Sequence, residues 1–264
     1  MQKGNVIRTV RAQPLVLLCC LTALSYSPAL FSGFIWDDQG VFENPHFGSF
    51  AGLVNIWSTR AEIPDQTHYW LLTHTTFWLE HALFGTNAQI FHATNILIHC
   101  ANCVLLYSLL ESYHLKGLLV CTFLFALHPV HVESVAWIIE RKVLLAAFCV
   151  LLSSICYLNF LSQKRLIFLF LVTLCYMASL LSKPTFVGFP CVLAMAAGLR
   201  GSLTRVNASY LILLSTASVT VGALAVHNQQ SREIVFSDLS FVDRLMLAPC
   251  IISFYVGKLL MPWD

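Results

Sequence analysis

The sequence has little charge. Only 11% of its 264 residues are Asp, Glu, Lys or Arg, against about 25% in a typical soluble domain. Hydrophobic residues make up 58% of the chain and the mean hydropathy is +0.74. The net charge is only +2 and the basic residues are scattered, which excludes a nucleic-acid-binding surface. The composition predicts an all-α membrane protein that uses the lipid bilayer as its solvent.

Familiar catalytic signatures are also missing. The sequence contains no P-loop, GxGxxG or GxSxG pattern and no internal repeat, so nothing indicates a nucleotide-binding fold or a repeat architecture. The ten cysteines lie in apolar segments, where we expect small buried apolar residues rather than disulfides. Cys100 and Cys103 lie inside such a segment, away from water, which argues against a zinc or redox motif.

Long apolar segments are what the chain does contain. They cover residues 14–35, 90–110, 115–128, 143–162, 166–181, 185–199 and 207–227, with an ambiguous segment at 245–262. We therefore expect residues 1–264 to form one polytopic domain of seven or eight spans. The first segment follows basic residues as a signal peptide does, but its apolar run continues to Ile35, which favours an uncleaved span.

Basic residues set the expected orientation. Lys3, Arg8, Arg11, Lys116, Lys164, Arg165, Arg200 and Arg205 fall on alternate connections, which the positive-inside rule places in the cytoplasm. Residues 36–87, 129–142, 182–184 and 228–244 are then expected outside. They hold most of the acidic residues, whereas the cytoplasmic connections hold only Glu111. We expect an extracytoplasmic working face, in a bacterial inner membrane or, alternatively, in the endoplasmic reticulum.

The stretch LHPVHVESVAWIIERK is the densest polar segment. The spacing of His128, His131 and Glu133 is compatible with a metal site, but no HExxH pattern supports it. The alternative is that Pro129 ends a span and that the histidines cap helix ends and position Glu133. No metal ligand or cofactor is assigned, and a divalent cation stays open.

Basic residues lie on three of the predicted outward connections, next to apolar segments: Arg141 with Lys142, Lys183, and Arg232 with Arg244. Arg141, Lys142 and Lys183 are placed at the depth of lipid headgroups, where a lipid-linked phosphate is the ligand that suits their charge. The alternative is that they reach toward headgroups or pair with neighbours such as Glu140.

Two further stretches have two interpretations each. THYWLLTHTTFWLEHALFG is aromatic and amphipathic, which predicts an interfacial helix with Trp70 and Trp78 at headgroup level. This helix either covers a cleft or anchors the loop. His92, Asn95 and His99 share one helical face, which indicates either a cavity lining or a polar seam between two spans.

Several motifs together resemble a known family. They are WDDQGVFENP, YWLLTHTTFWLEHALFGTNAQIFHATNILIHCANCVLLY, LFALHPVHVESVAWIIERKVLLA, SLLSKPTFVGFP and RLMLAPCIISFYVGKLLMPWD. In this order they resemble the membrane half of bacterial tetratricopeptide-repeat membrane proteins, which are related to the transmembrane-and-tetratricopeptide-repeat O-mannosyltransferases of the GT-C superfamily. The resemblance covers most of the chain.

The resemblance implies a fold and a site. The fold is a multi-span helical bundle of GT-C type with extracytoplasmic interfacial helices, and the donor is a polyprenyl-phosphate-linked sugar. Asp37 and Asp38 match the acidic pair of the first outer loop, where one carboxylate is a general base and the other orients the acceptor or a cation. Arg141 and Lys183 match the ERK and SKP motifs and would stabilise the leaving phosphate. The acceptor would be a hydroxyl of a protein, at Ser or Thr, or of a glycan.

Two departures from the family pattern accompany the resemblance. Val143 replaces the acid of the usual ERKD motif, which removes an expected partner of Arg141. The chain also ends at Asp264, where the family continues with further spans and tetratricopeptide repeats, so we expect a shortened member or a fragment.

Two other functions remain open: a scaffold that binds a lipid phosphate without transferring sugar, and a multipass transporter. For segment 245–262, which Pro249, Gly257 and Lys258 interrupt, we expect a helix that lies against the bundle.

Overall fold

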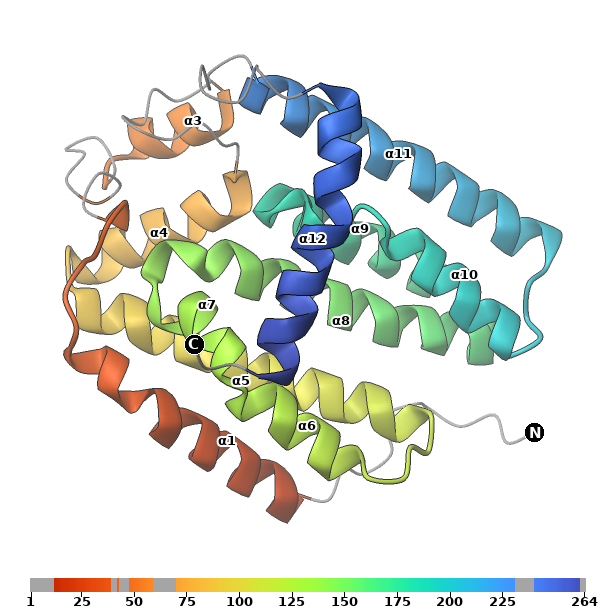
Figure 1. The fold of residues 1–264 in the computed structure, drawn as a ribbon, viewed down its shortest axis with the longest axis horizontal. Coiled ribbons are helices and arrows are strands. Elements are labelled where there is room, and N and C mark those ends of the chain that lie inside the picture. Colours follow the sequence, from red (N-terminus) through yellow and green to blue (C-terminus); the bar gives the residue numbers. More distant parts are fainter. Residues whose placement is uncertain (1–11, 39–41, 43–47, 59–69, 231–239, 262–264) are drawn as a thin grey trace.

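The protein is built from helices throughout the part of the chain that the structure describes. The computed structural model describes residues 12–38, 42, 48–58, 70–230 and 240–261 (Figure 1), and none of these residues forms a β-strand. The predicted all-α class is confirmed. Parts of the expected outward connections, at 39–41, 43–47, 59–69 and 231–239, and the end of the chain at 262–264 lie outside the described residues.

Every apolar segment expected from the sequence is helical. The segments form α1 (Ala12–Tyr26) with η1 (Ser27–Phe31), α5 (Ala88–Ser112), α6 (Leu118–Leu127), α8 (Arg141–Gln163), α9 (Leu166–Ser182), α10 (Phe189–Leu199), α11 (Arg205–Gln230) and α12 (Phe241–Leu260). The expected interfacial segment forms α4 (Leu71–Phe84), which follows α3 (Phe50–Ser58). Short connecting turns are η2 (Pro129–His131), α7 (Val132–Ala136), η3 (Ile138–Glu140) and η4 (Pro184–Phe186).

By length and composition, fewer helices qualify as membrane spans than the seven or eight that were predicted. Among the described residues, four helices are long and apolar enough to cross a membrane: Gln13–Phe31, Ala88–Ser112, Ile138–Gln163 and Arg205–His227. A fifth candidate is the pair Leu118–Leu127 and Pro129–Ala136, which is bent by 47°. Pro129 therefore ends α6 as predicted, because its ring cannot continue the helical hydrogen bonds. The total of seven or eight spans stays a prediction.

Helix α5 holds the bundle together through a polar seam. His92, Asn95, His99 and Asn102 are each at most 1% exposed and recur at the spacing of one helical face. Asn102 donates to the Leu144 carbonyl on α8 at 3.0 Å, and His99 Nε2 lies 3.1 Å from the Ala126 carbonyl on α6. Of the two readings of this face, the polar seam between spans is confirmed.

The main apolar core lies between α8 and α9, which pack as an antiparallel pair with α10 and α11 beside them. Tyr157 and Tyr176 are fully buried in it, and each hydroxyl is satisfied, by Asn207 at 2.9 Å and by the Phe186 carbonyl at 2.9 Å. Because these hydroxyls have partners, the core can bury two large aromatic residues without leaving a polar group unmatched.

The cysteines match their prediction only in part. All ten are free, and Cys100, Cys103, Cys149 and Cys156 are buried as expected. Cys20, Cys121, Cys191 and Cys250 are exposed instead. The expectation of burial was wrong for these four because an apolar helix in a membrane protein also presents apolar residues on its outer side, toward lipid.

Helix α12 stands apart from the bundle. It runs steeply across the direction of α5 and α8 in Figure 1, and its large apolar side chains are exposed, Ile252 at 63% and Leu260 at 74%. Ser240 and Asp243 form a capping box at its start, and the carbonyl of Leu259 lies 2.9 Å from His128 Nε2. The segment is helical as expected, but the expectation that it lies against the bundle is wrong for most of its described residues, because their side chains are exposed.

Candidate functional site

Arg141 forms a closed ion pair at the start of α8. Its side chain is fully buried, and NH1 donates to Glu80 of α4 at 2.5 Å. Nε donates to Asn95 Oδ1 at 2.7 Å and NH2 donates to the Phe91 carbonyl at 2.9 Å. The guanidinium also lies 4.4 Å from the ring centroid of Phe77. Arg141 therefore joins α4, α5 and α8, and no part of it is exposed to a ligand.

This arrangement corrects two expectations about Arg141. The structure does not present the guanidinium to a phosphate, because the protein itself occupies its donors and buries it. Val143 also does not leave Arg141 without a carboxylate, since Glu80 from a distant part of the chain supplies one. A phosphate-binding role for Arg141 has no support in this geometry.

Asn95 and Asp38 shape the turn that leads into α8. The amide of Asn95 donates toward the carbonyls of Val135, Trp137 and Ile138 at 3.3–3.4 Å. Asp38 is fully buried, and its carboxylate accepts from the backbone N–H groups of Ile35 at 3.1 Å and Ile139 at 3.0 Å. These bonds attach the first outer connection to η3, and so fix the position of the residues that follow.

Beside this closed pair lies a more open charge cluster, which we call the lysine cluster: Glu140, Lys142 and Lys183. Glu140 Oε1 lies 2.6 Å from Lys142 Nζ, and Oε2 lies 3.3 Å from Lys183 Nζ. The side chain of Lys142 is 7% exposed and that of Lys183 is 31% exposed. The alternative expectation that these lysines pair with Glu140 is confirmed. One carboxylate serves two cations, so the cluster keeps one net positive charge.

Helix α4 and the turn before η3 supply aromatic walls to the cluster. Lys142 Nζ lies 3.8 Å from a ring centroid of Trp70 and 5.6 Å from one of Trp137. Trp70 is only 9% exposed, so its ring packs within the protein, and its expected depth at headgroup level stays a prediction. Thr73 donates to the Ser182 carbonyl at 3.3 Å, which attaches α4 to the end of α9, directly before Lys183. Of the two interpretations of this helix, the structure favours a cover over the charged groups.

The two adjacent aspartates have different surroundings. Asp37 is exposed and lies within electrostatic range of Lys142. Asp38 is enclosed, and burial raises its pKa to about 6, an effect that the two backbone N–H donors oppose. Since both oxygens of Asp38 already accept backbone hydrogen bonds, Asp37 is the carboxylate of the pair that a substrate can reach.

The remaining predicted residues lie away from the lysine cluster. Glu133 is exposed on α7 and has no ion-pair partner among the described residues. His128 caps η2, accepting from the Val130 N–H at 3.2 Å, so its predicted capping role is confirmed. The side chain of His131 makes no capping hydrogen bond at the start of α7, so its predicted capping role is wrong. Its ring instead packs against Phe125 at 4.7 Å and His99 at 5.6 Å. Within the described ranges, no group of three or more His, Cys, Asp or Glu side chains is placed to hold a metal ion.

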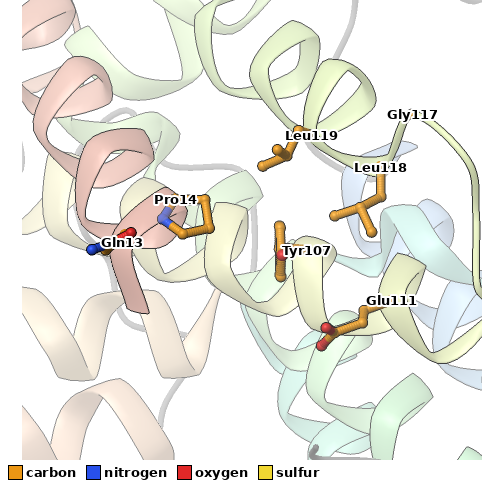
Figure 2. A pocket seen from close by; sticks show the side chains of 7 residues that line it. All are labelled: Gln13, Pro14, Tyr107, Glu111, Gly117, Leu118 and Leu119. Carbon is orange, nitrogen blue, oxygen red and sulfur yellow. The ribbon is translucent and has the colours of Figure 1, made fainter. Parts of the chain in front are cut away.

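A pocket of about 880 Å³ lies at the other end of α5. Figure 2 shows Tyr107 and Glu111 of α5 facing it beside Pro14 and Leu118. Arg141 bonds Phe91 and Asn95 near the start of α5, whereas Glu111 is in its last turn. At 1.5 Å per residue the two sites are separated by roughly 20–30 Å. This pocket is therefore distinct from the lysine cluster.

Three residues around Arg141 and the lysine cluster were not predicted from the sequence: Glu80, His74 and Trp137. A signal for the α4 residues was present, because Trp70, Thr73, His74, Phe77 and Glu80 recur every three or four residues and so share one face of the helix. The positive charge of Arg141 needs an acidic partner, so an acid on that face of α4 was the residue to look for.

Three curated relatives show what the chain is similar to. The chain is 34% identical over 160 residues to human Protein O-mannosyl-transferase TMTC1, a match that covers 56% of the chain and 18% of the relative. The mouse protein of the same name is 32% identical over 167 residues, covering 58% and 18%. Protein O-mannosyl-transferase F38B6.6 of Caenorhabditis elegans is 32% identical over 143 residues, covering 50% and 21%.

The match is confined to part of these relatives. The chain spans about a fifth of their length, and no family model and no solved structure matches it. The narrower expectations, a bacterial protein and the membrane half alone, stay predictions. Over more than half of its length, the chain is a relative of proteins named as TMTC-type protein O-mannosyl-transferases.

Proposed function

We propose that the chain is the membrane part of a glycosyltransferase that moves a sugar from a polyprenyl-phosphate carrier to an extracytoplasmic hydroxyl of a protein or glycan. The observation that supports it is the lysine cluster, with two cations on one carboxylate. The net charge of +1 on the lysine cluster matches the single negative charge of a phosphate diester. Lys183 is partly exposed, so a phosphate can reach it from outside the protein. The names of the relatives support transfer of mannose to protein.

Each of these residues has its own role in the proposed reaction. The oxygen of the acceptor hydroxyl forms a bond to the anomeric carbon while the bond from that carbon to the phosphate oxygen breaks. The exposed carboxylate of Asp37 takes the hydroxyl proton as general base. The electron pair leaves with the phosphate, whose growing negative charge Lys142 and Lys183 stabilise. Asp38 is a positioning residue, because it fixes the turn that holds Asp37 near Lys142.

The test is sugar transfer in vesicles that contain a polyprenyl-phosphate-linked mannose and a hydroxyl-bearing acceptor peptide. Asp37→Asn should lower the transfer rate about 100-fold or more, within the usual effect of removing a general base, and leave binding of the carrier unchanged. Lys142→Met should weaken carrier binding. Asp243→Asn, an exposed acid at the start of α12, is the matched control.

Each of the other functions predicts a different result. A scaffold that binds the carrier without transferring sugar would lose carrier binding in Lys142→Met, yet the wild type would show no transfer. A transporter would move the carrier or sugar across the membrane without forming a new glycosidic bond. Transfer that persists at the wild-type rate in Asp37→Asn would refute the assignment of the base.

A further inference from the structure

Two buried side chains near Lys142 have polar atoms without a hydrogen-bond partner in the described part of the chain. They are His74, at both ring nitrogens, and Trp137, at the indole Nε1. His74 is 3% exposed. Buried polar groups in folded proteins almost always have a partner, so each exception needs an explanation. These two belong to different elements, α4 and the turn before η3. The ring of Trp137 lies 5.6 Å from Lys142 Nζ, and His74 stacks on Trp70, whose ring lies 3.8 Å from the same nitrogen.

The surroundings of His74 show that its ring is neutral. It is stacked on Trp70 with ring centroids 6.1 Å apart and lies 6.4 Å from the ring of Phe77. Burial, and secondarily the charge of Lys142, lower the pKa of His74 to about 4. A neutral imidazole offers one N–H donor and one acceptor nitrogen. A phosphate diester can use only the donor, because its oxygens carry no hydrogen. A hydroxyl group can use both.

Trp137 completes the same neighbourhood from the other side. Its ring lies within 5.6 Å of Lys142 Nζ and makes an edge contact of 4.8 Å with the ring of Trp36, the residue before Asp37. An indole N–H is a donor only. The unmatched groups near Lys142 are therefore two donors and one acceptor.

We propose that His74 and Trp137 are hydrogen-bonding contacts for the hydroxyl groups of a sugar whose phosphate is held by Lys142 and Lys183. This inference rests on the proposed function, and deepens it by naming the groups that recognise the sugar rather than the phosphate. Flat aromatic faces beside matched donors and an acceptor suit a hydroxyl-rich ring. In the unliganded protein these groups stay unsatisfied, and the sugar supplies their partners.

The experiment compares two ligands, inorganic phosphate and a hexose 1-phosphate, binding to the purified full chain. His74→Phe and Trp137→Phe each keep an aromatic ring but remove the nitrogens. Each should weaken binding of the hexose 1-phosphate about tenfold, since a site built for hydroxyl groups loses affinity when a partner is removed, and leave binding of inorganic phosphate within about twofold. His81→Phe, on the same helix but bonded to Thr86, is the control and should change neither.

The outcomes separate this inference from the proposed function. If Lys142→Met weakens both ligands while His74→Phe and Trp137→Phe weaken neither, the phosphate site stands and the sugar contacts are refuted. Equal losses for both ligands in His74→Phe would also refute them, because they would indicate a general effect on the cluster. If the wild type binds neither ligand, the proposed function fails, and this inference fails with it.

Thermal unfolding of the unliganded variants gives a second measurement. Replacing an unsatisfied imidazole by phenylalanine removes polar atoms that have no partner, so His74→Phe should unfold at the wild-type temperature or above it. A clear loss of stability would show that His74 has a structural partner and would overturn the inference. Trp137→Phe keeps the binding test available if His74→Phe does not fold.

Discussion

Arg141 and Lys142 are consecutive buried residues, yet Arg141 is enclosed by its own partners, whereas Lys142 shares a carboxylate with the partly exposed Lys183. Arg141 is matched by one carboxylate, one amide and one carbonyl, and is fully buried. Lys142 shares its carboxylate with Lys183 and has two unsatisfied polar groups beside it. Neighbouring residues on a helix point about 100° apart, which is enough to send one cation into the bundle and the other toward its end.

The difference shows how to distinguish a structural cation from a binding cation. In a structural cation, the hydrogen-bond donors have protein partners and the side chain is not exposed to solvent. A binding cation has too few partners and a neighbour that reaches solvent, here Lys183. Both residues belong to the same ERK motif, so only the contacts tell them apart. Four predictions test this distinction, from the largest expected effect to the smallest.

Glu80→Ala should have the largest effect. It leaves the buried guanidinium of Arg141 without its carboxylate, and removal of one partner of a buried ion pair costs about 3–5 kcal/mol. Thermal unfolding followed by tryptophan fluorescence measures it. The double variant Glu80→Met with Arg141→Met should recover most of the loss, because no charge is then buried. A single variant as stable as the wild type would show that Arg141 is not a closed structural group.

Lys142→Met should change activity far more than stability. Loss of one stabilising charge at a leaving group lowers the rate by about 100-fold to 1000-fold, while Glu140 keeps its pairing with Lys183. Initial transfer rates and unfolding temperature, measured on one preparation, separate the two effects. If Lys142→Met destabilised the protein as much as Glu80→Ala, the contrast between the two cations would be wrong.

Asp38→Asn should remove a pH dependence of stability. Burial raises the pKa of Asp38 from 3.8 to about 6 in the folded protein, so the folded state binds this proton more tightly than the unfolded state. The contribution is most favourable below pH 4 and is lost as the pH rises to about 6, a change of about 3 kcal/mol. Unfolding temperatures measured from pH 4 to 7 should decline in the wild type and decline less in Asp38→Asn. Equal slopes would contradict the pKa shift.

Lys183→Gln should have the smallest effect on stability. Its side chain is partly exposed and its pairing with Glu140 is long, at 3.3 Å, so the change in unfolding free energy should be below about 1 kcal/mol. Affinity for a lipid phosphate should fall severalfold at low salt and differ less at high salt, because exposed charges are screened. A titration with vesicles containing polyprenyl phosphate at two salt concentrations measures it. Salt-independent binding in the wild type would show that the exposed charge of Lys183 does not attract the phosphate.

The sequence predicted the helices well and the site only in part. Apolar runs place α5, α8 and α9 within a few residues because a long apolar segment in a membrane has few structures besides a helix. Pairing across the chain was not predictable in the same way. Glu80 lies 61 residues before Arg141, and nothing in a local pattern says which of several acids will meet a given cation.

The same limit applies to the aspartate pair. Asp37 and Asp38 are adjacent in the sequence, and the resemblance implied one general base and one orienting carboxylate without saying which residue has which role. Their difference depends on the backbone N–H of Ile139, more than a hundred residues further along the chain. Periodicity shows that an acid is near a helix end, whereas packing decides whether its oxygens are free.

The buried Arg141 also imposes an order on how the chain is assembled. Arg141 is the first residue of α8, and burying its charge without its carboxylate and carbonyl partners is unfavourable, so α8 packs into the bundle more readily when those partners are in place. Glu80, Phe91 and Asn95 all precede Arg141 in the chain and leave the ribosome first. Helices α4 and α5 are thus made before α8 and can pack against it during synthesis. In a Glu80 variant this packing is weakened, so newly made chains should be recognised by membrane quality control.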